Sequence, residues 1–102
     1  MYYENTIKEI RTRIKKVYPD TKPVFMQTIM LDDGLVPLSY LLWMCDELQI
    51  WDTTSIDSAV KAGRWIGWVL AHFELHEFME NNETRDMVHE DREQGFDKPH
   101  SL

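Results

Sequence analysis

The chain has 102 residues, 43% of them hydrophobic, and its formal net charge is -7. This length and apolar content predict a single folded domain over residues 1–102 and argue against a disordered chain. The acidic balance argues against nucleic-acid binding by the whole surface, because nucleic acids attract basic surfaces. The single cysteine, Cys45, excludes a disulfide within the chain and a metal site built from cysteines alone.

The sequence carries no sign of membrane insertion or export. The apolar run at residues 65–73 is much shorter than the roughly 20 residues that a membrane-spanning helix needs. No charged and then apolar leader is recognisable at the start, and a lone cysteine suits a reducing compartment. We therefore expect a cytoplasmic protein without a membrane partner.

Residues 4–18 predict an amphipathic helix, with apolar side chains on one stripe at Ile7, Ile10, Ile14 and Val17. Three cations flank that stripe: Lys8, Arg11 and Lys15. They could contact nucleic-acid phosphates. We favour a solvated helix face instead, because no set of Asn, Gln or aromatic side chains accompanies them to read bases.

The segment at residues 24–31, VFMQTIML, is β-branched and apolar enough for a short strand. It has no evident pairing partner in the chain. An extended segment packed across the helices, or pairing with the same segment of a second copy, are the other options. A turn at residues 32–34, DDG, then leads to a helix expected over residues 37–49, whose inner stripe is Leu38, Leu41, Leu42, Cys45 and Leu48.

The longest predicted helix starts near Ser55 or Asp57, either of which could cap it, and runs to Met79. It is expected to lie antiparallel to the preceding helix, because the connection between the two is short. Small residues recur along it at every fourth position: Ala59, Gly63, Gly67 and Ala71. Glycine inside a helix costs about 1 kcal/mol relative to alanine, so this row predicts a closely packed helical neighbour from this chain or a second copy.

This central helix is apolar on two sides. One predicted face carries Val60, Gly63, Ile66, Gly67, Leu70 and Phe73. A nearly opposite face carries Trp65, Trp68, Val69, His72, His76 and Met79. Because a helix that is apolar all round is a buried one, we expect the first face to meet the chain's own core and the tryptophan face to meet a second copy. The residues predicted for self-association are Gly63, Trp65, Gly67, Trp68 and His72. A monomer with half-exposed tryptophans is the alternative.

Asparagines 81 and 82 are expected to break the central helix. Residues 83–94 predict a final surface helix, capped by Asn82 and stopped by Gly95, and residues 95–102 predict a flexible tail. The expected fold class is all-α. It comprises a helical hairpin core, an N-terminal amphipathic helix and a C-terminal surface helix in a dimeric bundle, with a short extended segment near residues 24–31 as an option.

One spacing suggests a metal site. His72, His76 and Glu80 recur at every fourth position, which would align them along one side of a helix, where they could bind Zn²⁺ or another divalent ion. The metalloprotease pattern needs a glutamate directly after the first histidine, where this chain has Phe73. Histidines with a structural role beside tryptophans are more common, so we expect no cofactor and keep the metal as an alternative.

Other catalytic patterns are weaker, and we assign no catalytic residue. Glutamates at positions 74, 77, 80 and 83 could bind Mg²⁺, but only Asp46 and Glu47 could face them from another helix, so a solvated acidic surface is favoured. Cys45 and Ser39 have no histidine nearby in the sequence. The scattered glycines form no phosphate-binding loop.

Three segments carry a resemblance: residues 35–44, LVPLSYLLWM, residues 61–68, KAGRWIGW, and residues 83–86, ETRD. They resemble segments of short uncharacterised proteins encoded by tailed bacteriophages. The resemblance covers residues 35–90 and rests on packing residues, without a catalytic signature. It implies a small phage or prophage product that works in the bacterial cytoplasm, and it assigns no site residue.

The sequence thus favours a non-enzymatic helical protein that self-associates as a homodimer and binds a host or phage protein. Its acidic residues 74–97 are the candidate contact surface for that partner. Two alternatives stay open. One is a metal-dependent enzyme that uses His72, His76 and nearby carboxylates. The other is nucleic-acid binding through the basic N-terminal helix.

Overall fold

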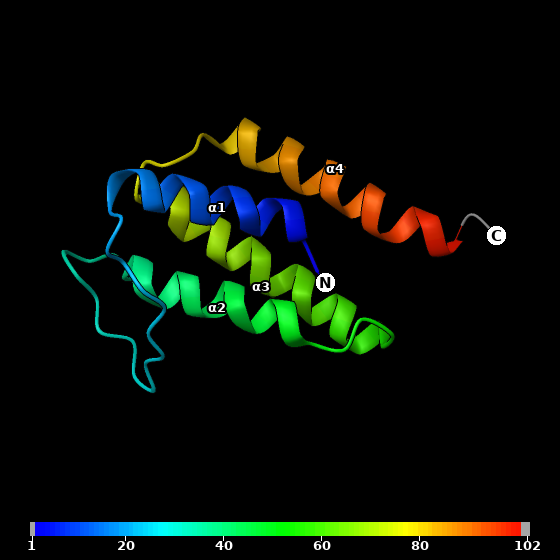
Figure 1. Cartoon of the computed structure of the whole chain (residues 1–102), viewed down its shortest axis with the longest axis horizontal. Helices are drawn as coiled ribbons and strands as arrows, with labels where there is room; N and C mark the ends of the chain where they lie inside the picture. Colours follow the sequence, from blue (N-terminus) through cyan, green and yellow to red (C-terminus); the bar gives the residue numbers. More distant parts are fainter. Residues whose placement is uncertain (1, 101–102) are drawn as a thin grey trace.

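The computed structural model describes the backbone of residues 2–100 and the side chains of residues 2–91. Within this range the chain forms four helices and no strand: α1 (Glu4–Val17), α2 (Leu38–Ile50), α3 (Ile56–Leu75) and α4 (Asn81–His100). Helices α2 and α3 run antiparallel as a hairpin, α1 packs on α2, and α4 lies along α1 (Figure 1). The all-α fold class and the hairpin predicted from the sequence are confirmed.

The core forms where α1, α2 and α3 meet. Each of these helices contributes apolar side chains spaced three or four residues apart, so that they share one face of their helix. The fully buried members include Ile7, Ile10, Ile14, Leu41, Cys45, Leu48, Ile66, Val69 and Phe73. Burying one such large apolar side chain contributes about 1.5–3 kcal/mol, so this cluster is the main source of stability. None of the described helices is both long and apolar enough to cross a membrane.

The two apolar sides of α3 differ from those predicted. The prediction places Val69 on the tryptophan face, but this side chain is fully buried; it places Val60 and Gly67 on the core face, but both are exposed. The buried arc of α3 follows Ala62, Ile66, Val69 and Phe73, because this is the side that faces α2 and the apolar stripe of α1. The tryptophans therefore lie next to the buried arc of α3, not opposite to it. The row of small residues lies along the other edge of the same arc.

The end of α3 also differs from the prediction. Ser55 caps the start as expected, and its hydroxyl accepts a hydrogen bond of 3.4 Å from the Ser58 N–H. The helix ends at Leu75, four residues before Met79. Glu77 adopts a left-handed φ of 64°, which turns the chain back. Phe78 then stacks on Phe73, with ring centroids 4.8 Å apart, and this contact offsets the hydrogen bonds of a longer helix.

Polar contacts attach α4 to α1. Asp91 accepts hydrogen bonds from the Thr6 backbone N–H at 2.9 Å and from Asn5 Nδ2 at 3.3 Å. The N-cap residue of α1, Tyr3, makes no capping hydrogen bond with its own side chain. A carboxylate from α4 therefore takes the place of a local cap and satisfies an otherwise unpaired N–H at the positive end of α1.

Arg13 makes the second attachment. Its guanidinium donates to both carboxylate oxygens of Glu83, at 3.0 and 2.7 Å, and to the Phe78 carbonyl oxygen at 2.9 Å. It also pairs with Glu9 one turn earlier on α1. The hydrogen bond from Arg13 is the largest cause that lowers the pKa of Glu83 below its ordinary value of 4.5. Arg13 thus joins α1 to both the turn after α3 and the start of α4.

The segment at residues 24–31 is neither strand nor helix, so of the options that the sequence left open a strand paired within the chain is excluded. The only β pairing in residues 2–100 is an isolated bridge between Asp32 and Leu35. Without a second strand, the backbone of this segment has no ladder to join. Much of it is solvent-exposed, including Phe25 at 57% and Met30 at 74%. The result is an apolar loop that projects beside the start of α2 (Figure 1).

The backbone of α4 continues as a helix to His100, so the predicted stop at Gly95 is wrong. The helical penalty of one glycine, about 1 kcal/mol, weakens a helix without necessarily ending it. The flexibility predicted for residues 95–102 stays a prediction, and residues 101–102 of that tail lie outside the described residues.

Replacing the carboxylate that caps α1 should destabilise the fold. We expect Asp91→Ala to lower the free energy of unfolding by about 1 kcal/mol, the usual effect of losing a cap, as measured by urea denaturation followed by circular dichroism. Asp86→Ala, on an exposed position of the same helix, is the matched control and should change stability little. Equal stabilities of the two variants would contradict the capping role of Asp91.

Candidate functional site

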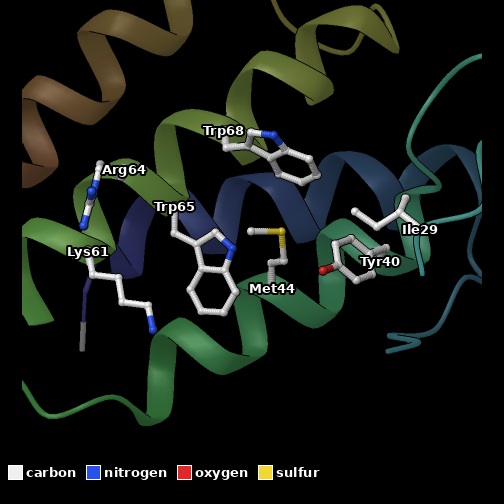
Figure 2. Close-up of a pocket in the computed structure, with 7 residues that line it drawn as sticks. All are labelled: Ile29, Tyr40, Met44, Lys61, Arg64, Trp65 and Trp68. Atoms are coloured by element: carbon white, nitrogen blue, oxygen red, sulfur yellow. The ribbon is translucent and has the colours of Figure 1, made fainter. Parts of the chain in front are cut away.

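An open apolar hollow lies along the α2–α3 hairpin and has a volume of about 460 Å³. We call it the aromatic groove; its lining residues are Ile29, Tyr40, Met44, Lys61, Arg64, Trp65 and Trp68. Figure 2 shows these side chains converging from both helices and from the loop before α2. The spacing of three or four residues on each helix explains the arrangement, because such residues share one helix face.

Aromatic contacts within the chain hold the wall of this groove. Trp65 stacks on Trp51 with ring centroids 4.2 Å apart and meets Trp43 edge-on at 6.1 Å. Trp68 meets Tyr40 edge-on at 6.3 Å, and Tyr40 stacks on Trp43 at 5.5 Å. Each such pair is worth about 0.5–1.5 kcal/mol beyond area burial. The tryptophans of α3 are therefore half-buried against α2 of the same chain, with the remainder of each ring open to the groove.

Two cations stand at the rim of the aromatic groove. The Lys61 ammonium lies over the Trp51 ring at 4.9 Å and over the Trp65 ring at 5.8 Å. Arg64 is exposed three residues further along α3. Among the described side chains, neither cation forms an ion pair with a carboxylate, whereas Arg11 and Arg13 do. The groove thus combines a rigid apolar wall with positive charge that the described part of the fold leaves unpaired.

The residues predicted for self-association divide between two sides of α3. Trp65 and Trp68 line the aromatic groove, and His72 follows them, with its ring centroid 4.1 Å from that of Trp68. A Cβ added to Gly63 would lie 3.3 Å from the Tyr3 hydroxyl, so this glycine accommodates a neighbour within the chain. Gly67 instead lines a second hollow, between α3 and α4. Self-association itself stays a prediction.

The predicted metal ligands are not assembled into a site. Because α3 ends at Leu75, Glu80 does not continue the row of His72 and His76 on that helix. The Nε2 atom of His76 lies 2.6 Å from the Val36 carbonyl oxygen, which gives this ring a structural partner. Within residues 2–91, no three His, Cys, Asp or Glu side chains lie close enough together to hold a metal ion.

The three α1 cations predicted to contact phosphates differ in their surroundings. Arg11 donates to the Gln49 side chain at 3.1 Å and pairs with Asp46, so its guanidinium ties α1 to α2. Lys8 and Lys15 are exposed beside a shallow hollow that they share with Arg11. One cation of the predicted phosphate-binding set therefore has a structural role, and the role of the set in nucleic-acid binding stays a prediction.

Cys45 is unsuited to nucleophilic chemistry. It is fully buried in the core, and burial raises the pKa of its thiol to about 12. A thiol of such high pKa is protonated at neutral pH, and the thiolate is the reactive form. The expectation that Cys45 is a buried hydrophobic side chain is confirmed.

Sequence reasoning missed part of the aromatic groove. Tyr40 and Met44 lie outside the inner stripe predicted for α2, although their spacing of four residues places them together on another part of the helix. Ile29 comes from a loop whose position no sequence pattern predicts. The two tryptophans are recognised, but for contact with a second copy.

His72 should make stability depend on pH. Burial, followed by the nearby His76, lowers the pKa of His72 below its ordinary value of 6.5. The unfolded chain then binds more protons than the folded chain as the pH falls below that value, so the free energy of unfolding should decrease on acidification. We expect His72→Gln, which cannot be protonated, to show a smaller decrease between about pH 7.5 and pH 5.5 in urea titrations. Parallel pH profiles of the two proteins would contradict this assignment.

Comparison of the chain with protein-family models, with curated proteins and with solved structures gave no match. A proposal about function therefore rests on the geometry of the site.

Proposed function

We propose that this protein is a non-enzymatic binding protein that holds an apolar segment of a partner protein in the aromatic groove. The observation that carries this proposal is the gathering of two tryptophans, a tyrosine and a methionine around one open hollow. Aromatic residues and Met are enriched in protein interfaces, and Trp and Tyr most often supply the few side chains that dominate binding energy.

The rigidity of the groove supports the same proposal. Trp65 and Trp68 are held by rings of α2 before any partner arrives, so binding would not have to order them. Preorganisation of this kind strengthens binding, because less side-chain entropy is lost on association. A partner that covers the open parts of both rings would gain about 25 cal/mol for each Å² of apolar surface removed from water.

The chemistry of the lining favours binding over catalysis. Among the described residues, no carboxylate, histidine or thiol lines the groove, and these groups most often carry proton transfer or nucleophilic attack. Lys61, the one amine in that lining, lies over the Trp51 and Trp65 rings. The resemblance to bacteriophage proteins favours a host or phage protein of the bacterial cytoplasm as the partner.

A random peptide display library tests this function even though the partner is unidentified. We expect the wild-type protein to enrich peptides that bind at least about tenfold more weakly to Trp68→Ala, because a central aromatic side chain typically contributes this much or more. Affinities would be measured by isothermal titration calorimetry with synthetic peptides.

Leu75→Ala is the matched control, since Leu75 is exposed on α3 and does not line the groove. It should bind the selected peptides like the wild type. Circular dichroism of both variants checks that the fold is kept. A selection that yields no peptide dependent on Trp68 would contradict the proposed function.

Self-association is a second candidate function. On the small-residue side of α3, Ile56 is 82% exposed and Val60 is 55% exposed. Gly67, on the same side, has no described heavy atom within 4 Å of an added Cβ. A helix of a second copy could therefore approach this side closely and cover its apolar side chains.

Sedimentation velocity of two variants distinguishes the sides of α3. If copies associate through the small-residue side, Gly67→Leu should shift the protein toward monomer and Trp68→Ala should not, because only the first blocks close approach. The reverse result would place the contact on the tryptophans, as the sequence predicts. A wild-type protein that stays monomeric at high concentration would rule out self-association.

A further inference from the structure

We infer that the segment bound by the aromatic groove is acidic at one end, with Asp or Glu side chains next to apolar anchor residues. This inference rests on the proposed function and adds the chemical class of the partner. Its basis is the uneven distribution of charge along the groove. Lys61 and Arg64 stand together at one end, and Ile29 and Tyr40 lie at the other (Figure 2).

The position of Lys61 is set by the aromatic wall. Its ammonium lies within cation–π range of two indole rings. In such an interaction the face of the ring attracts the cation. The two contacts therefore favour a position of the charge at the groove. A carboxylate that approaches this end would meet a cation that is already in place.

Arg64 adds a second cation on the same helix. In the described part of the chain its guanidinium has no carboxylate partner, although the protein carries an excess of carboxylates. Arg11 and Arg13 of α1, by contrast, are paired and have structural roles. A guanidinium can bind a carboxylate through two parallel hydrogen bonds, so Arg64 offers a directional contact where Lys61 offers a point charge.

The charge of the whole chain narrows the class of partner further. With a net charge of -7, the chain as a whole repels an acidic protein, and the groove end is a local exception, as are the exposed lysines of α1. Electrostatic complementarity of this kind contributes orientation and specificity more than affinity. It therefore favours a short acidic segment with apolar anchors, bound in one direction, over a broad acidic surface.

The inference is tested with the peptides from the display selection, whose binding is measured to the wild type and to a variant with reversed charges at the groove. We expect peptides selected by the wild type in a Trp68-dependent way to be enriched in Asp and Glu at one end. The double variant Lys61→Glu/Arg64→Glu should bind those peptides about tenfold more weakly, the scale expected for two partly exposed ion pairs. The difference should shrink as salt is raised, because salt screens exposed charges.

Lys15→Glu/Lys16→Glu is the matched control, because it makes the same change in net charge at exposed positions of α1. It should bind the selected peptides nearly as well as the wild type. An equal loss in both double variants would mean that only net charge matters and would overturn the inference. Trp68-dependent peptides without acidic enrichment would also overturn it, while leaving the proposed function intact.

Two other occupants are outcomes of the same experiment. Single-stranded nucleic acid also stacks on aromatic rings beside cations, so oligothymidine is titrated alongside the selected peptides. Tighter, Trp68-dependent binding of oligothymidine than of the acidic peptides would replace a protein partner with a nucleic acid. Dissociation of a wild-type dimer by Trp68→Ala would instead identify a second copy as the occupant, and both results would overturn the inference.

Discussion

The packing of α3 against the aromatic side chains of α2 is the contact on which the rest of this structure depends. Trp65 meets Trp43 of α2 edge-on and stacks on Trp51, the residue that follows α2, so large rings as well as the aliphatic core set the register of the hairpin. Because these rings belong to the chain's own hairpin, the wall of the groove forms as the protein folds. The same contacts therefore stabilise the fold and shape the surface that we propose to be functional.

The attachment of α4 follows a different principle. Its described part contributes few apolar side chains, and charged contacts to α1 compensate for this, namely the Asp91 cap and the pairing of Arg13 with Glu83. Because the pKa of Glu83 is lowered in the folded state, its contribution is present above the ordinary carboxyl pKa and is lost as the pH falls through the lowered value. Acid should therefore weaken the ion pair that joins α1 to α4.

In the proposed function, different parts of the aromatic groove determine the affinity and the orientation of the bound segment. Apolar anchors in contact with Trp65 and Trp68 would supply most of the binding energy, and charges at the rim would select the direction of the bound segment. The net negative charge of the chain adds a constraint, since it disfavours an acidic partner that extends far beyond the rim. These features together are the basis for proposing a binder of short segments, whose groove would need little rearrangement on binding.

Local signals in the sequence determined the starts of α1, α2 and α3, the Ser55 cap and the all-α class, because helical periodicity and caps depend on residues a few positions apart. The predicted Asn82 cap is wrong, since α4 already begins at Asn81. The sequence also singled out Trp65 and Trp68, but it could not say which neighbour covers them. The end of α3, the cap that Asp91 provides for α1 and the place of Ile29 in the groove were decided only by tertiary structure. Each depends on residues far apart in the chain, whose meeting is set by how the helices pack and not by any local pattern.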